Sequence, residues 1–134
     1  MKNKDFAVFI LTHGRPDNVI TFNTLKNTGY VGPIFLIIDN EDKTAESYYQ
    51  NFGRENVIMF DKKMYADQVD EGNNFDERRT ITHARNACFD IAKKVGVKYF
   101  MQLDDDYPAL LFRIDGNKNY PIGHFIFKKL FPLA

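Results

Sequence analysis

The sequence predicts an α/β fold, a three-layer sandwich in which a mostly parallel, Rossmann-like sheet lies between helices. Short apolar segments alternate along the chain with longer amphipathic ones, the order expected when each strand is followed by a helix that packs back onto the sheet. The apolar segments are also continuous, without the alternation of a strand that has one wet face. Each of these strands is therefore expected to be buried on both faces.

The first half of the chain predicts three strands and two helices. The expected strands cover residues 6–11, 34–38 and 57–60. The first helix is expected to begin at Pro16, a residue that suits the first helical turn, and to stop at Gly29. Thr44 is expected to cap a second, shorter helix that Gly53 ends.

The second half predicts one long helix and two further strands. Residues 61–75 show no clean period and are predicted to form a long loop. Residues 76–95 carry apolar side chains at spacings of three and four, which predicts the longest helix. A fourth buried strand is expected at 99–103 and another strand at 109–114. The amphipathic tail, 120–134, is predicted to form a short helix.

Composition restricts the class of protein. The 134 residues suit a single domain over 1–134, and 18 basic against 18 acidic residues exclude a broadly basic nucleic-acid coat. The single cysteine, Cys88, excludes an internal disulfide and suits a reducing compartment. No segment has the roughly 18 uninterrupted apolar residues of a membrane helix. A cytoplasmic domain without membrane association is the expectation.

Polar side chains follow three of the expected strands. Thr12 to Arg15 follow the first strand, Asp39 ends the second, and Asp104 to Asp106 follow the fourth. The carboxyl ends of parallel strands meet at one edge of a sheet, where ligands bind at the point at which the strand order reverses. These clusters are therefore predicted to form one site.

The three consecutive aspartates give the strongest chemical signal. In an extended segment Asp104 and Asp106 point the same way, so both carboxylates can face one Mg²⁺ or Mn²⁺ whose remaining ligands are water and phosphate. Asp39 could accept a hydrogen bond from a ribose or a base edge, and Arg15 could pair with phosphate oxygens. Each assignment has an alternative without a ligand. The three aspartates could form a solvated acidic turn, Asp39 could be a turn residue, and Arg15 could be a surface arginine.

The start of the long helix is unusually polar. Helical spacing places Arg78, Thr82 and Arg85 along one side, and positive charge beside three aspartates would suit a metal-bound diphosphate. The alternative is a solvated helix face. His13 and His83 are interpreted as structural residues. The sequence contains no Ser-His-Asp arrangement and no Walker phosphate loop.

Four motifs in order resemble a known family. They are Phe-Ala-Val-Phe-Ile-Leu-Thr-His-Gly-Arg-Pro at 6–16, Ile-Ile-Asp-Asn-Glu at 37–41, Thr-His-Ala-Arg-Asn-Ala at 82–87 and Gln-Leu-Asp-Asp-Asp-Tyr at 102–107. Together they resemble a GT-A-type glycosyltransferase. More narrowly, they are similar to the phage and TET/JBP-associated glycosyltransferases linked to modified DNA bases. The resemblance covers roughly residues 6–115.

The resemblance implies a nucleotide-diphospho-sugar donor, with a UDP-sugar as the first candidate, and a modified base in phage-type DNA as the acceptor. It implies that the Asp-x-Asp motif, Asp104 and Asp106, holds Mn²⁺ or Mg²⁺. With the interpretation of the residues above, the expected donor site comprises Thr12, Arg15, Asp39, Arg85, Asn86, Asp104 and Asp105. DNA affinity would require a local basic patch such as Lys62-Lys63 or Lys128-Lys129. A phage-encoded chain would act in the host cytoplasm.

The family pattern normally continues well past the Asp-x-Asp strand, whereas about 28 residues follow Asp106 here. The acceptor half is therefore expected to be curtailed. The catalytic base is expected to lie beyond the chain end, and an oligomer or a partner chain is expected to complete the site. Two alternatives stay open at this point. One is a nucleotidyltransferase that releases pyrophosphate, and the other is a truncated, non-catalytic nucleotide-sugar-binding module.

Overall fold

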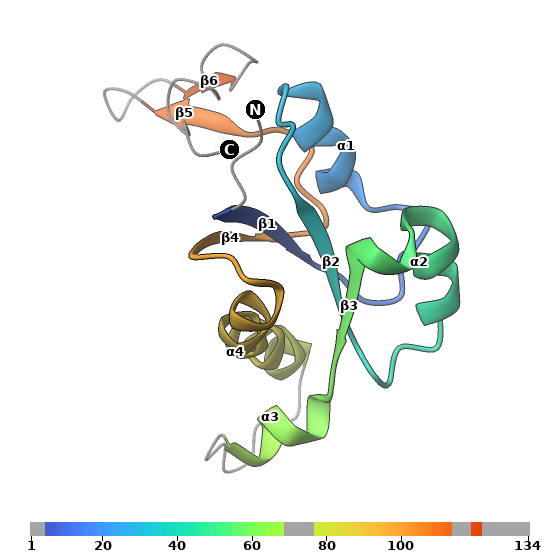
Figure 1. Cartoon of the computed structure of the whole chain (residues 1–134). Coiled ribbons are helices and arrows are strands. Elements are labelled where there is room, and N and C mark those ends of the chain that lie inside the picture. Colours follow the sequence, from blue (N-terminus) through green and yellow to red (C-terminus); the bar gives the residue numbers. More distant parts are fainter. Residues whose placement is uncertain (1–4, 69–76, 114–118, 122–134) are drawn as a thin grey trace.

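The computed structural model describes residues 5–68, 77–113 and 119–121, with side chains described over 5–65 and 83–110. Its main feature is a four-stranded, all-parallel sheet (Figure 1). The strands are β1 (Phe6–Leu11), β2 (Ile34–Asp39), β3 (Val57–Phe60) and β4 (Tyr99–Asp104). The predicted α/β, Rossmann-like class is confirmed.

The strand order is β3-β2-β1-β4, so β1 lies inside the sheet. The chain moves outward from β1 through β2 to β3 and then crosses back to place β4 on the other side of β1. In register, Leu11 of β1 lies opposite both Ile37 and Asp104. The strand order therefore reverses between β1 and β4, where sheets of this kind form a crevice beyond the strand ends.

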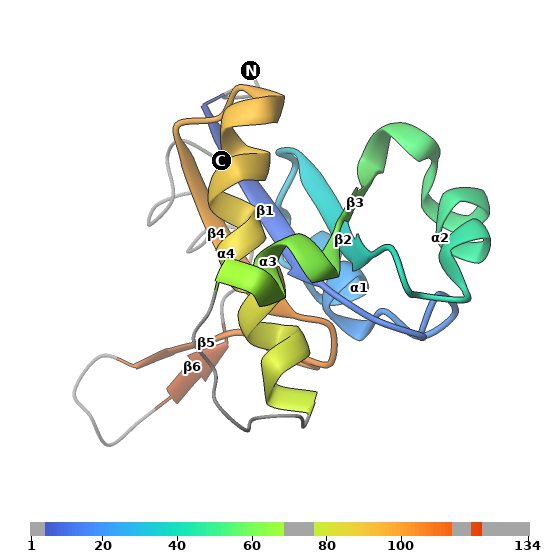
Figure 2. The ribbon, with the colours of Figure 1, turned by 90° about the horizontal axis from the view of Figure 1, so that it is seen from below.

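Helices cover both faces of the sheet (Figures 1 and 2). The helices α1 (Ile20–Asn27) and α2 (Ala45–Phe52) pack on one face with Val8 and Ile10 of β1. On the other face α4 (Glu77–Val95) and α3 (Lys62–Gln68) pack with Ala7 and Phe9. Because successive strand residues point to opposite faces, the continuous apolar run of β1 supplies both cores at once.

The first helix begins later than predicted, at Ile20 and not at Pro16. Val19 precedes it with φ −89° and ψ 81°, outside the helical region, so residues 12–19 remain a connecting loop after β1. Thr44 does precede α2, but it makes no capping hydrogen bond, because its hydroxyl donates to Asp42 at 2.6 Å. The short 3-10 helix η1 (Arg54–Asn56) follows α2.

The predicted loop over 61–75 is wrong at its start, where α3 forms. A carboxylate oxygen of Asp61 accepts the N–H groups of Lys63 and Met64 at 3.0 and 3.3 Å, as an N-cap residue does. The segment is too short for apolar residues to recur at helical spacing, but Asp61 is a residue type that commonly caps a helix. Residues 69–76 lie outside the described residues.

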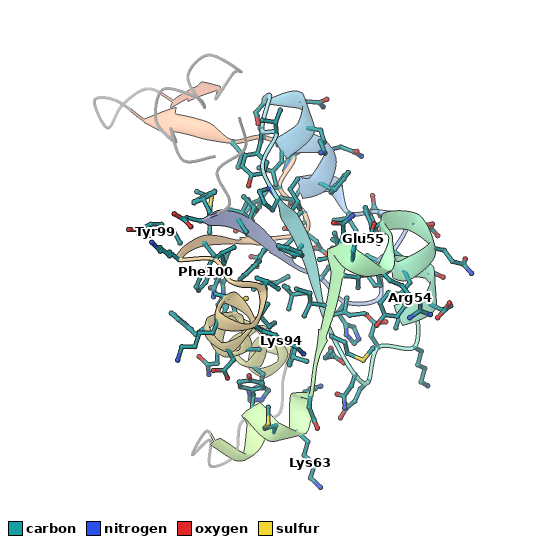
Figure 3. All side chains as sticks on the ribbon, viewed as in Figure 1. Arg54, Glu55, Lys63, Lys94, Tyr99 and Phe100 are labelled. Carbon is teal, nitrogen blue, oxygen red and sulfur yellow. The ribbon has the colours of Figure 1, made fainter. Side chains whose placement is uncertain are left out.

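The fourth strand is partly exposed along its length and not buried on both faces as predicted. Within the described residues β4 pairs with β1 alone, which leaves its other edge unpaired. Tyr99 points outward from the sheet, whereas Phe100 points toward α4 (Figure 3). The apolar run of β4 therefore predicted a strand correctly without locating it in the sheet.

Beyond β4, the short strands β5 (Leu111–Arg113) and β6 (Asn119–Pro121) pair antiparallel. The strand predicted at 109–114 is confirmed at its centre. The helix predicted for 120–134 is wrong at its first two residues, which belong to β6, and residues 122–134 lie outside the described part. Among the described helices, none combines the length and the apolar character needed to cross a bilayer.

Candidate functional site

A cleft of about 380 Å³ opens at the carboxyl edge of the sheet. It is lined by residues that end or follow the four parallel strands, together with one residue of α3 and one of α4: Leu11, Thr12, His13, Arg15, Asp39, Phe60, Lys62, Ala84, Asp104, Asp105 and Asp106. The predicted gathering of polar clusters at this edge is confirmed.

Asp105 anchors a buried chain of hydrogen bonds behind the cleft. Its carboxylate accepts the Thr12 hydroxyl at 2.7 Å, and the Tyr48 hydroxyl lies 2.7 Å from the same Thr12 oxygen. Because Thr12 has a single hydroxyl hydrogen and gives it to Asp105, Tyr48 must be the donor to Thr12. The Tyr48 oxygen in turn accepts the Arg15 N–H at 2.8 Å. Burial raises the pKa of the Tyr48 phenol and so keeps this donor protonated.

The guanidinium of Arg15 lies at the rim of the cleft. Its Nη1 is 3.4 Å from an oxygen of Asp105, and the Arg15 side chain is 54% exposed. This long contact with a half-exposed partner holds the guanidinium only weakly. The arginine is therefore free to turn toward another anion.

Asp104 is held from two sides. Arg85 of α4 donates to one carboxylate oxygen at 3.1 Å, and the Tyr107 hydroxyl donates to the other at 3.2 Å. Gln102 fixes the arginine, because it accepts from the guanidinium at 3.3 Å and donates to the Arg85 carbonyl at 2.9 Å. Burial and the charge of Asp104 raise the pKa of Tyr107. The sequence predicted positive charge of this helix beside the aspartates, and Arg85 of α4 provides it through its contact with Asp104.

The three aspartates differ in their surroundings. The strand ends at Asp104, and Asp105 and Asp106 form a turn, so the alternation of an extended segment does not apply to them. Asp104 is half-buried, Asp105 is buried and Asp106 is exposed. Among the described residues, Asp106 has no hydrogen-bonding or ion-pair partner, which leaves its carboxylate open toward the cleft.

The turn that carries the aspartates is tied to α1. Thr21 donates its hydroxyl to the Asp104 carbonyl and accepts the Tyr107 N–H at 2.9 Å. Thr24 donates to the Tyr107 carbonyl at 2.7 Å. Two threonines of one helix therefore fix the backbone of this turn.

A second pair of aspartates, Asp39 and Asp42, lies near the ends of β1 and β2 and contacts His13. The imidazole Nδ1 of His13 is 2.8 Å from an oxygen of Asp39 and 3.7 Å from an oxygen of Asp42. The side chains of Asp39 and Asp42 are only 2% and 1% exposed, whereas that of His13 is 53% exposed. The half-exposed ring of His13 therefore lies between the cleft and two buried carboxylates.

Backbone and side-chain donors compensate the buried charge of Asp42. Its oxygens accept the Gly14 N–H at 2.9 Å and the Thr44 N–H at 2.8 Å, together with the Thr44 hydroxyl. Burial alone would raise the pKa of Asp42, but these hydrogen bonds and the nearby His13 outweigh it and lower the pKa below its usual value. Asp42 is therefore a carboxylate at neutral pH.

Most of the predicted donor residues come together. Thr12, Arg15, Asp39, Asp104, Asp105 and Asp106 line the cleft, and Arg85 contacts Asp104. Asn86 is exposed on α4 and is not part of the lining that the structure describes. What these residues bind stays a prediction.

Sequence reasoning missed four polar contributors to the site, namely His13, Asp42, Tyr48 and Gln102. The sequence pattern identifies His13 only as a structural residue, and it assigns no role to Tyr48, which lies within the helix expected between Thr44 and Gly53. The Thr-His-Gly-Arg motif itself was the available signal for His13. The partners of Tyr48 lie 33 and 36 residues away in the chain, so its role had no local signal.

A comparison with protein families gives a match to the model described as TET-Associated Glycosyltransferase over residues 6–122. The matched segment contains every strand described here and every residue that lines the cleft. Comparisons with curated proteins and with solved structures give no match. On this match, which spans most of the sequence, the chain belongs to the TET-associated glycosyltransferase family.

Proposed function

We propose that the cleft binds a nucleotide-diphospho-sugar together with Mn²⁺ or Mg²⁺ and transfers the sugar to an acceptor. One observation carries the proposal. The four carboxylates of Asp39, Asp104, Asp105 and Asp106 line the cleft, where the permanent cations of the described lining are Arg15 and Lys62, and Arg85 adds a third positive charge from behind Asp104. Three of these carboxylates lie where the strand order reverses, beside the end of β1. A divalent cation would balance them and attract a diphosphate.

The chemistry of the donor set fits a hard cation. Among the described residues, no group of three or more His, Cys, Asp or Glu side chains is arranged to hold a metal by itself. Mg²⁺ at nucleotide sites needs only one or two carboxylates, since water and phosphate oxygens fill the other positions. Asp106 and the half-buried Asp104 would supply these carboxylates. When bound, such an ion stabilises the charge that develops on the leaving nucleoside diphosphate.

Arg15 would contact the diphosphate directly, whereas Arg85 would act through its charge. Arg15 is half-exposed and weakly held, so its guanidinium can leave Asp105 and pair with phosphate oxygens in a bidentate way. Arg85 is anchored by Gln102 and contributes a fixed positive charge beside Asp104. Fixed donors of this kind lower the barrier because they need not reorganise as the leaving group becomes charged.

For the acceptor we propose a modified base in DNA. Lys62 lines the cleft, and its neighbour Lys63 extends from α3 away from the sheet (Figure 3). A basic pair at the mouth of the cleft could contact backbone phosphates while a base reaches the donor. Binding through such contacts would weaken as salt is added.

The test is calorimetric titration of UDP- and GDP-sugars with and without Mn²⁺, on the wild type and on Asp106→Asn. We expect binding that Mn²⁺ strengthens, and a loss of at least about tenfold in that strengthening for the variant. Asp17→Asn removes an exposed carboxylate outside the cleft and should bind as the wild type does. Binding that is equal in Asp106→Asn and wild type, or no binding at all, would contradict the proposal.

A product assay separates the alternatives. Release of a nucleoside diphosphate from the bound sugar nucleotide supports sugar transfer, and release of pyrophosphate from a nucleoside triphosphate indicates a nucleotidyltransferase. Donor binding without turnover toward DNA that carries hydroxylated bases indicates a binding module instead.

A further inference from the structure

Asp39 occupies the position from which an acidic residue commonly binds ribose, at the carboxyl end of the second strand of a nucleotide-binding sheet. In this fold both carboxylate oxygens of Asp39 already have partners within the protein. The Asp39 side chain is 2% exposed, one of its oxygens accepts the Glu41 N–H at 2.8 Å, and the other lies 2.8 Å from the His13 ring. Asp39 therefore has little surface to offer a ligand.

His13 covers the carboxylate of Asp39 and lines the cleft beside it. A carboxylate oxygen can only accept a hydrogen bond, so the contact with Asp39 requires the hydrogen on Nδ1. Asp42, 3.7 Å from the same nitrogen, favours the same arrangement. In the neutral ring Nε2 is then an acceptor, and it makes no hydrogen bond to any residue in the part of the chain that the structure describes.

We infer that His13 contacts the ribose of the bound nucleotide, with Nε2 accepting a hydrogen bond from the 2′- or 3′-hydroxyl. Asp39 and Asp42 are positioning residues that fix the tautomer and the orientation of the ring. An acceptor nitrogen selects a hydroxyl over a phosphate oxygen, because the phosphate oxygen has no hydrogen to give. The inference rests on the proposed function, since it identifies part of the same ligand.

The arrangement of the cleft supports a nucleoside on this side. His13 follows β1, Asp39 ends β2, and the apolar ring of Phe60 ends the neighbouring β3. The three aspartates lie at the end of β4, on the other side of β1. The cleft is thus divided into an end suited to a ribose and base and an end suited to a metal-bound diphosphate.

The experiment compares UDP and GDP with their 2′-deoxy and 3′-deoxy forms by calorimetry in Mn²⁺ at pH 8, so that affinity and tautomer are measured under the same conditions. For the wild type, removing the contacted hydroxyl should weaken binding about two- to tenfold, the effect of one neutral hydrogen bond. His13→Ala should weaken binding of the ribonucleotide by a similar factor and bind the matching deoxynucleotide no more weakly than the ribonucleotide. Gln50→Ala, an exposed substitution on α2 outside the cleft, should keep the wild-type preference.

Two further readouts separate ribose contact from a structural role. Nitrogen-15 NMR of the wild type should show His13 with the hydrogen on Nδ1 at pH 8. Asp39→Asn can donate to Nδ1 and should move the hydrogen to Nε2 while the imidazole is retained. His13→Gln keeps an amide oxygen as acceptor and should retain part of the ribose preference, with an unchanged melting temperature.

The outcomes are distinct. If the wild type binds a nucleotide but His13→Ala keeps the ribose preference, or if no preference exists, the inference about His13 is overturned and the proposed function is not. Hydrogen on Nε2 in the wild type also overturns the inference. If neither UDP nor GDP binds in Mn²⁺, both the inference and the proposed function fail.

Discussion

At the scale of single residues, the site depends on carboxylates whose surroundings differ although their chemistry is the same. Asp42 is buried and fully hydrogen-bonded, Asp105 is buried against Thr12, and Asp106 is exposed to the cleft. A buried carboxylate requires donors, and an exposed one can serve a ligand. Burial therefore separates the aspartates that are held by donors of the fold from Asp106, whose carboxylate is open to the cleft.

Asp42 gives a prediction on pH. Its pKa in the folded chain lies below the ordinary value of 3.8, so the carboxylate contributes stability above about pH 4 that is lost as the pH falls through the folded-state pKa. Asp42→Asn should therefore be about 1–3 kcal/mol less stable than the wild type at pH 7, and the difference should shrink below pH 4. Urea unfolding of both proteins from pH 7 to pH 3 measures it.

Asp17→Asn is the matched control for Asp42→Asn, because Asp17 is an exposed aspartate. Its unfolding free energy should differ little from that of the wild type throughout this range. A difference between Asp42→Asn and the wild type that stays constant with pH would contradict the assignment of Asp42.

At the scale of elements, α1 acts as the support of the aspartate turn. Thr21 is fully buried, and its hydroxyl bridges the Asp104 carbonyl and the Tyr107 N–H. Packing of α1 on the sheet is thereby coupled to the backbone that presents the carboxylates. A helix without a residue in the cleft lining is thus required for the geometry of the site.

Thr21→Val tests this coupling, since valine has a similar shape but no hydroxyl. The change leaves two backbone groups unpaired and should lower the free energy of unfolding by about 1–3 kcal/mol. It should also weaken the proposed Mn²⁺-dependent binding of a nucleotide, because the turn is no longer fixed. Thermal unfolding and calorimetry measure the two effects.

Thr28→Val is the control for the helix itself. The Thr28 hydroxyl is buried and, among the residues that the structure describes, bonds only to the Leu25 carbonyl near the end of α1. Its loss should lower stability without changing the proposed nucleotide binding. Equal losses of affinity in Thr21→Val and Thr28→Val would show that general destabilisation, and not the turn, sets the affinity.

At the scale of the whole molecule, stability rests on the central strand that serves both cores. Phe9 is fully buried, stacks on Phe100 with ring centroids 5.0 Å apart, and meets Phe35 edge-on at 5.9 Å. Such aromatic contacts add to the effect of burial. Loss of Phe9 would therefore affect β1, β2 and β4 together.

Phe9→Ala should lower the free energy of unfolding by about 3–5 kcal/mol, a large part of the total for a domain of this size. Phe89→Ala is the comparison, because Phe89 is 62% exposed although it also contacts Phe100, at 5.3 Å. Its cost should stay below about 1 kcal/mol. Chemical denaturation measures the loss in the free energy of unfolding for each variant. Similar losses in the two variants would contradict the central role of β1.

The sequence by itself determined the class of fold, the parallel strands and the edge at which polar residues gather. Apolar runs and helical periods are local patterns, and the edge follows because parallel strands end on the same side. The position of β4 as an outer strand of the described sheet could not be predicted, because strand order depends on contacts between residues far apart in the chain. The short helix α3 was missed because its one local signal is the cap residue Asp61.

Only the tertiary structure decided which polar residues face the cleft. The partners that matter are far apart in the chain, 26 residues for His13 and Asp39 and 93 for Thr12 and Asp105. Their contacts depend on strand order and register, which set burial and leave His13 exposed over a buried Asp39. Spacing along the chain indicates which residues meet at the sheet edge, and packing in three dimensions determines which of them a ligand can reach.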